Sequence, residues 1–164
     1  MRLPKLIVFD LDFTLWDCGG TWCDCLSPPF KLESRKVTDR NGKHIRFYRD
    51  VESILDFCDE NEIAKGLASR TEQPTWAREL LDLLGATQRF EFSEIYPSSK
   101  LRHFESLRVS SGIDYEQMLF FDDEMRNIRE VSELGVTCVY VENGFYEDLF
   151  ESGLAEFSEA RSNE

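Results

Sequence analysis

The chain has 164 residues with 41% hydrophobic content, enough for one domain with a real core and too apolar for a disordered protein. Its 19 basic and 32 acidic residues give a net charge of −13, which argues against nonspecific binding to nucleic acids or to anionic membranes. No apolar run approaches the length of a membrane span, and five cysteines cannot all pair within one chain, so we expect a reducing, cytoplasmic location.

The first predicted strand, Leu6 to Asp10, ends on two carboxylates, Asp10 and Asp12. An apolar strand has no structural reason to end this way, because desolvated, unpaired charge is costly. Side chains alternate along an extended backbone, which predicts both carboxylates on the same side. Two carboxylates facing one spot indicate a bound cation, a shared proton, or an acid paired with a nucleophile.

Residues 16–48 are predicted to form a flap inserted directly after these acids. Asn41-Gly42 between the extended segments 36–40 and 43–47 is the strongest short signal for a β-hairpin, with a type I′ turn. The chain before it, with Gly19-Gly20 and Pro28-Pro29, is predicted to be irregular.

Three features of the flap leave alternatives open. The cluster Cys18, Cys23 and Cys25 is either a metal or redox site or a set of free thiols, and its spacing, which matches no common zinc pattern, favours free thiols. Seven of the 19 basic residues fall at positions 31–49, where they either attract anionic substrates or form solvated hairpin faces. Aromatic side chains either line the substrate entrance or pack the flap; they are Trp16, Trp22 and Phe30.

The rest of the chain alternates helices and strands. Helices are predicted at Val51 to Cys58, Pro74 to Leu84, Leu101 to Val109, Asn127 to Leu134 and Tyr146 to Phe157, with Asp50 as the cap of the first. Strands are predicted at Ile63 to Ala68, Phe92 to Tyr96, Met118 to Phe121 and Thr137 to Val141. This alternation is typical of parallel strands joined by right-handed crossovers, so we expect an α/β fold, with residues 1–164 as a single domain.

Polar residues follow four of the predicted strands: Asp10 and Asp12, Ser69, the loop to Lys100, and Asp122 with Asp123. Because the carboxyl ends of parallel strands share one edge, these groups should converge there. Two carboxylates about 4 Å apart repel by roughly 4 kcal/mol at an effective dielectric constant near 20. Lys100 alone could not balance three or four carboxylates and an anionic substrate, so the site calls for a divalent cation, and all-oxygen ligands suit Mg²⁺.

The motifs at these strand ends resemble those of a known superfamily. Asp-Leu-Asp-Phe-Thr-Leu at 10–15, Ser69, Lys100 and Phe121-Asp122-Asp123 follow the order of the four motifs of the haloacid dehalogenase (HAD) superfamily. More narrowly, segments 9–16, 28–30, 68–71, 94–97 and 120–124 resemble its small magnesium-dependent phosphatases. The resemblance implies a three-layer α/β/α, Rossmann-like fold with a mostly parallel sheet and a small hairpin flap instead of a cap domain.

The same resemblance implies an activity. It is the Mg²⁺-dependent hydrolysis of phosphomonoesters through an aspartyl-phosphate, on phosphotyrosine-like or sugar-phosphate substrates. The partner would be a phosphorylated small molecule or a phosphorylated protein side chain. By this analogy Asp10 is the nucleophile and Asp12 the general acid and base.

The remaining roles follow the motifs. Ser69, Arg70 and Lys100 would hold the phosphoryl oxygens. The metal would be held by Asp10, by the backbone carbonyl of Asp12, and by Asp123 with support from Asp122. We favour Asp123 as the direct ligand because Asn127 lies four residues further on, as in the fourth motif.

Two rival functions remain at this stage. A receiver-like signalling module also uses strand-end acids, Mg²⁺ and a phosphorylated Asp. However, its acceptor Asp follows a middle strand, and here the middle strand ends in Ser69. A phosphotransferase or mutase of the HAD superfamily would need a cap to close over its substrate, and the chain is too short to supply one.

Overall fold

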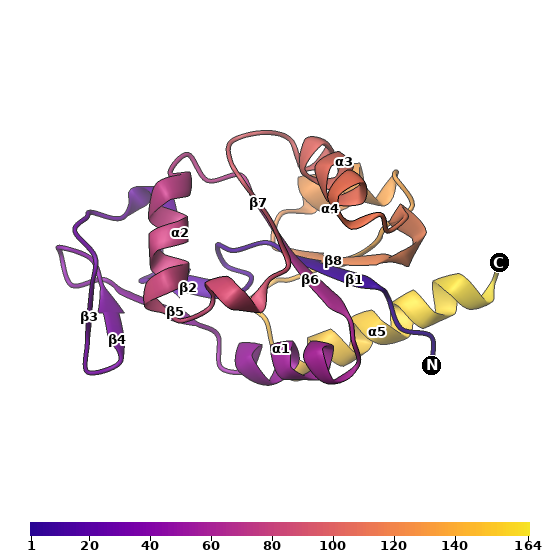
Figure 1. Ribbon diagram of the computed structural model, residues 1–164, viewed down its shortest axis with the longest axis horizontal. Coiled ribbons are helices and arrows are strands. Elements are labelled where there is room, and N and C mark those ends of the chain that lie inside the picture. The colour runs from indigo at the N-terminus through magenta and orange to yellow at the C-terminus, as the bar shows by residue number, and fades with distance from the viewer.

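Five parallel strands form the central sheet of the computed structural model, which describes residues 1–164 (Figure 1). They are β1 (Leu6–Phe9), β6 (Ala64–Ser69), β7 (Phe92–Ile95), β8 (Met118–Asp122) and β9 (Thr137–Tyr140). The strand order is β7-β6-β1-β8-β9, and β1 pairs in parallel with both β6 and β8. The order along the chain therefore reverses between β1 and β8, and sheets of this kind bind ligands beyond the carboxyl ends of the strands at such a point.

The strand order also bears on the receiver alternative. Counted along the chain, the parallel strands lie in the order third, second, first, fourth, fifth. Receiver modules have the flavodoxin-like order second, first, third, fourth, fifth. The sheet is therefore of the Rossmann type and not of the receiver type.

Helices cover both faces of the sheet, as the sequence predicts. Figure 1 shows α3 (Lys100–Ser111) and α4 (Met125–Ser132) on one face, and α1 (Val51–Glu60) and α5 (Glu147–Ser162) on the other. Side chains of β1 alternate between two cores: Leu6 and Val8 face α3 and α4, whereas Ile7 and Phe9 face α1 and α5. The three-layer α/β/α prediction is confirmed. None of the helices combines the length and the apolar character that crossing a membrane requires.

All five predicted helices are present with ends that shift by up to five residues, and at two of them the structure shows contacts that the sequence did not predict. The carboxylate of Asp50 makes no hydrogen bond to α1; instead Oδ2 accepts one from the backbone N–H of Glu147 at 3.0 Å and joins the starts of α1 and α5. The last helix continues beyond Phe157, because Arg161 packs over the ring of Phe157 and its carbonyl accepts a hydrogen bond from the Arg2 guanidinium at 3.0 Å. Both differences arise from contacts between residues far apart in the sequence.

The flap is an antiparallel sheet of four strands and not a lone hairpin. Its order is β2-β5-β4-β3, with β2 (Trp16–Cys18), β3 (Lys31–Glu33), β4 (Lys36–Thr38) and β5 (His44–Phe47). Strands β2 and β3 were not predicted, because segments of three residues are too short to show an alternating pattern.

The hairpin predicted around Asn41-Gly42 is confirmed, but the type I′ turn predicted for it is wrong. A type I′ turn needs a positive φ at both central residues, and of these two only Gly42 has one, at 81°. The Asp39 carboxylate shapes this loop, because Oδ1 accepts hydrogen bonds from the backbone N–H groups of Asn41 (2.9 Å) and Lys43 (2.8 Å). Two consecutive positive φ values occur instead at Ser34-Arg35, in the two-residue turn between β3 and β4.

The flap shares its core with the main sheet. Trp16, Val37 and Ile45 from the flap belong to the same buried cluster as Ile7 and Phe9 of β1. Helix α2 (Pro74–Leu83) lies beside the flap in Figure 1. The single domain expected for residues 1–164 stays a prediction, and this shared core supports it.

Helix α5 packs so closely on the sheet that Gly153 has no room for a side chain. A Cβ added there would lie 2.7 Å from Cζ of Phe121 and 3.2 Å from Cγ2 of Val139. In an exposed helix Gly→Ala is stabilising, but overpacking a core costs about 1–3 kcal/mol. We expect Gly153→Ala to lower the free energy of unfolding, measured by urea denaturation. Ser152→Ala, at the exposed neighbouring position, is the control and should leave the free energy of unfolding unchanged. If Gly153→Ala also leaves it unchanged, α5 has room for a side chain at this position.

Candidate active site

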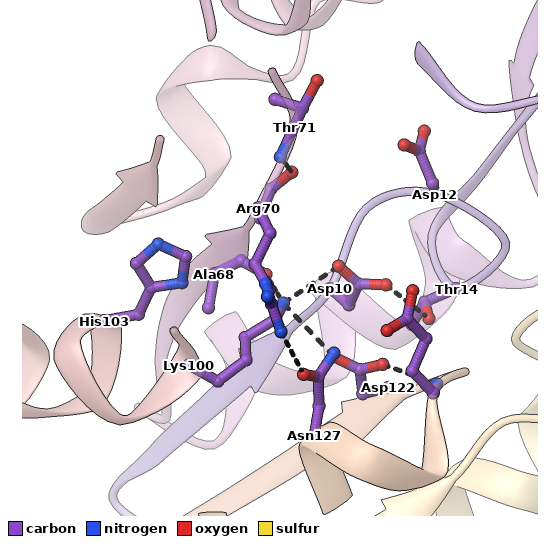
Figure 2. A network of polar contacts seen from close by, with 12 residues as sticks. Asp10, Asp12, Thr14, Ala68, Arg70, Thr71, Lys100, His103, Asp122 and Asn127 are labelled. Atoms are coloured by element: carbon purple, nitrogen blue, oxygen red, sulfur yellow. Dashed lines mark hydrogen bonds and ion pairs between the residues drawn. The ribbon is translucent and has the colours of Figure 1, made fainter. Parts of the chain in front are cut away.

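A buried ammonium group joins the ends of β1 and β8. Lys100, the first residue of α3, has a side chain that is 1% exposed, and its Nζ lies 3.1 Å from Oδ1 of Asp10 and 3.2 Å from Oδ2 of Asp122 (Figure 2). The same Nζ donates to the backbone carbonyl of Ala68 in β6. Although burial disfavours the charged ammonium, the two carboxylates hold the pKa of Lys100 above its usual value. The convergence predicted from the strand ends is therefore present.

Three carboxylates form one acidic group beside this lysine. Oxygen atoms of Asp10, Asp122 and Asp123 all lie within 4.8 Å of one another. Burial, with neighbouring carboxylates adding to it, raises the pKa of Asp10 to about 8, of Asp122 to about 7 and of Asp123 to about 6. One ammonium does not balance three carboxylates, so the donor set fits a hard divalent cation, which prefers oxygen ligands.

Asp122 and Asp123 have different surroundings. Asp122 is fully buried and its oxygens already have partners: Oδ1 accepts from the Glu124 N–H at 2.7 Å, and Oδ2 from the Asn127 side-chain amide at 3.1 Å. Asp123 lines the open cavity beside Asp10, which Asp122 does not. This difference is consistent with Asp123 as a direct metal ligand and Asp122 as its support, the arrangement favoured from the spacing to Asn127.

Thr14 and the side chain of Asn127 make contacts in the site that were not predicted from the sequence. The buried Thr14 hydroxyl donates to Oδ2 of Asp10 at 3.4 Å, so both oxygens of that carboxylate have a partner. Asn127 bridges two elements, because its amide donates to Asp122 and its carbonyl accepts from the Arg70 guanidinium at 3.1 Å. The contact of Thr14 had one signal in the sequence, a hydroxyl residue four positions after the strand-end acid Asp10.

The expected phosphate-binding residues surround a cavity of about 350 Å³ at this edge of the sheet. Ser69, Arg70 and Lys100 all line it, together with Asp10 and Asp123. The loop after β6 is itself ordered by its own side chains, since the Ser69 hydroxyl accepts from the Thr71 N–H at 3.3 Å. These side chains come from the end of β6, the loop after it and the start of α3, so the cavity that Asp10 lines has both cationic and hydroxyl donors.

Asp12 lines the same cavity but lies outside the acidic group. Figure 2 shows its carboxylate apart from Asp10 and Asp122, and its oxygens are not among those within 4.8 Å. The strand ends at Phe9, and a turn begins at Leu11, whose carbonyl accepts a hydrogen bond from the Thr14 N–H at 3.1 Å. Because the chain is no longer extended here, simple alternation does not place the Asp12 side chain. Its backbone carbonyl accepts no hydrogen bond from the protein, and its role as a ligand stays a prediction.

The flap contributes to the cavity through a few residues. Trp22 is 52% exposed and lines the opening, with its ring edge-on to Phe13 at 5.5 Å. Trp16 is completely buried and Phe30 nearly so, and Phe30 contacts the ring of Trp76 in α2. Of the three aromatic residues singled out, Trp22 therefore lines the entrance, and the other two pack the flap.

The three flap cysteines divide in a similar way. Cys18 and Cys23 are buried close to Asp12, and Cys25 is exposed. The one group of side chains close enough to share a metal ion is the acidic group at Asp10.

The fold and the cavity define the chain as a HAD-superfamily protein without a cap domain, and the comparisons with known proteins agree. The model of the acid phosphatase family matches residues 2–160, and the chain belongs to that family. It is 44% identical over 163 residues to magnesium-dependent phosphatase 1 of Homo sapiens, covering 98% of this chain and 91% of that protein. A HAD-like hydrolase superfamily protein of Schizosaccharomyces pombe is 39% identical, over 84% of this chain and 85% of its own. Among solved structures, a putative phosphatase from Clostridium difficile matches with a TM-score of 0.68 and 15% identity, covering 98% and 92% of the two chains, which shows the shared fold.

The raised pKa values predict how the metal-free protein responds to pH. Between pH 6.5 and 8 the folded chain holds protons on Asp10 and Asp122 that the unfolded chain has already released, so the free energy of unfolding falls as the pH rises. The slope is at most about 1.4 kcal/mol per pH unit for each carboxyl group. Urea denaturation in the presence of EDTA measures it, and Asp10→Asn should reduce the slope. If the slope in Asp10→Asn equals that of the wild type, Asp10 is not one of the groups that hold a proton in this pH range.

Proposed function

We propose that the protein is a Mg²⁺-dependent phosphomonoester hydrolase that forms an aspartyl-phosphate on Asp10. The observation that carries this proposal is the Asp10 carboxylate at the strand-order reversal, held by Lys100 and Thr14 and open to the cavity beside Asp123. The human relative's name, magnesium-dependent phosphatase 1, supports both the metal and the reaction class.

The residues present fit a magnesium ion. Asp10 and Asp123 would hold it with carboxylate oxygens, and the free backbone carbonyl of Asp12 would supply a further oxygen. When bound, the ion neutralises negative charge on the carboxylates and on the phosphoryl oxygens. Its charge would also let Asp10 ionise despite the burial that raises its pKa to about 8.

The first half-reaction transfers the phosphoryl group to the enzyme. A carboxylate oxygen of Asp10 attacks the phosphorus, and the bond from phosphorus to the leaving oxygen breaks as Asp12 donates its proton to that oxygen. The products are a free alcohol or phenol, an acyl phosphate on Asp10 and an ionised Asp12. Burial raises the pKa of Asp12, which favours the protonated form needed at the start of this step.

The second half-reaction releases phosphate. Water attacks the phosphorus of the acyl phosphate while Asp12 takes its proton, which restores the Asp10 carboxylate and the protonated Asp12. Ser69, Arg70 and Lys100 would hold the phosphoryl oxygens throughout. Phosphoryl transfer depends mainly on positioning and charge stabilisation, so these donors would supply much of the rate enhancement.

The open cavity supports two substrate classes, phosphotyrosine-like groups and sugar phosphates. No cap covers the site, so a phosphorylated protein side chain could enter as well as a small phosphorylated metabolite. Protein-tyrosine phosphatase activity is thus one form of the proposed function. A panel of phosphotyrosine peptides, sugar phosphates and phosphorylated glycated amines, assayed with Mg²⁺, decides between these classes. A cytoplasmic location, in keeping with the odd number of cysteines, belongs to the same proposal.

The rival functions predict a different time course. A receiver module keeps its phosphoryl group and stops after one turnover, whereas a hydrolase releases phosphate steadily from p-nitrophenyl phosphate. A mutase would return the phosphoryl group to its substrate and would need a cap to exclude water. The strand order and the membership of the acid phosphatase family favour the hydrolase.

Replacing the nucleophile should abolish turnover without unfolding the protein. We expect Asp10→Asn to lower kcat by more than about 10⁴-fold, because the amide cannot attack phosphorus. Acid quenching of wild-type enzyme with ³²P-labelled substrate should trap label on the protein, and Asp10→Asn should carry none. Asp148→Asn, on the exposed surface of α5, is the matched control and should keep wild-type activity. Near-normal turnover by Asp10→Asn would rule out the covalent mechanism.

The two adjacent acids after β8 should respond differently to metal. Asp123→Asn removes a proposed ligand, so the Mg²⁺ concentration for half-maximal activity should rise by about 100-fold or more. Asp122→Asn leaves the proposed ligands in place and should raise it by about 10-fold, the lower end of the range for residues that support a ligand. Activity titrations from micromolar to 100 mM Mg²⁺ measure both shifts. The reverse ranking would make Asp122 the direct ligand.

A further inference from the structure

One oxygen of Asp12 receives every hydrogen bond that the carboxylate makes. Oδ1 accepts from the indole Nε1 of Trp16 at 2.8 Å, from the backbone N–H of Cys23 at 3.1 Å, and from the Cys18 thiol at 3.7 Å. No protein group donates to Oδ2. The two oxygens of Asp12 are therefore inequivalent, and all three donors belong to the flap.

The strongest of these donors is held rigidly. The Trp16 side chain is completely buried, and its ring stacks on Phe47 of β5 with the centroids 6.5 Å apart. The same two residues face each other in the pairing of β2 with β5. Because the indole is part of the packed flap, its N–H fixes the direction in which Oδ1 of Asp12 points.

We propose that Trp16 is a positioning residue, which orients the Asp12 carboxyl group so that Oδ2 exchanges the proton with the reacting oxygen in the cavity. This inference rests on the proposed function, in which Asp12 is the general acid and base. A general acid must lie within hydrogen-bond reach of its target, and a carboxyl group free to rotate spends little time in that arrangement. The flap would then be part of the catalytic apparatus through Trp16 as well as a wall of the cavity.

The test separates substrates by their need for a proton. Trp16→Phe keeps an aromatic ring on Phe47 and removes the N–H. With an alkyl phosphate, whose leaving group must be protonated, kcat should fall about 10–100-fold with KM within about 2-fold, a part of the 10²–10⁴-fold that general acid catalysis provides. With 2,4-dinitrophenyl phosphate, whose leaving group needs no proton, kcat/KM should stay within about 3-fold of the wild type, because kcat/KM reports only the steps up to departure of the leaving group and not the later attack of water.

A double-mutant cycle adds a second readout. Asp12→Asn removes the general acid, so combining it with Trp16→Phe should lower kcat for the alkyl phosphate no further. Trp76→Phe is the matched control: it makes the same change at an aromatic contact of α2 with the flap, and should leave both substrates unaffected.

Two outcomes would overturn the proposal. They are an equal fall in kcat/KM on both substrates, or an effect of Trp16→Phe on the alkyl phosphate that multiplies with that of Asp12→Asn. If Trp16→Phe does not fold, as judged by its thermal unfolding, 3-benzothienylalanine at position 16 keeps the two-ring shape without the N–H and gives the same test. Failure of the proposed function is distinct, because then Asp12→Asn itself would hydrolyse the alkyl phosphate at the wild-type rate.

Discussion

The Lys100 ammonium between Asp10 and Asp122 is the interaction on which the rest of the site depends. Its Nζ lies 3.1 Å and 3.2 Å from the two carboxylates, with almost no contact with solvent. Any one of these charges buried alone would be driven to its neutral form, so each requires the others in place. The three residues come from the end of β1, from α3 and from β8. The ion group therefore forms only where these elements are packed together, and the geometry of the site is built into the fold.

The group is nevertheless unbalanced, since Asp123 adds a third carboxylate to a site with one ammonium. Burial, to which the neighbouring carboxylates add, raises the pKa values of all three acids. Asp122 has hydrogen-bond partners for both oxygens, Glu124 and Asn127, but its pKa is still raised to about 7. All three acids therefore favour a bound cation, which would stabilise their ionised forms.

Much of this arrangement follows from the sequence because its signals are local. Apolar runs that end in acids, a serine or a lysine mark strand ends, and the rules of parallel sheets bring those ends together. The parts that could not be predicted depend on partners distant in the chain. Asp50 bonds to the N–H of Glu147, and Asn127 reaches Arg70. The type I′ turn predicted at Asn41-Gly42 was wrong because the carboxylate of Asp39, which lies outside the dipeptide, fixes the conformation of the loop.

The orientation of Asp12 is the most instructive of these cases. Asp10 and Asp12 are two residues apart, but the extended chain ends before Asp12, because a turn begins at Leu11. Asp10 is then held by the central sheet through Lys100, and Asp12 by the flap through Trp16 and Cys23. The flap shares its buried core with β1. Separating the flap from the sheet would therefore cost about 25 cal/mol of free energy for each Å² of apolar surface exposed to water. The proposed nucleophile and the proposed acid are thus set by two different sheets that one core holds in fixed relation, an arrangement that needs no closing cap to align them.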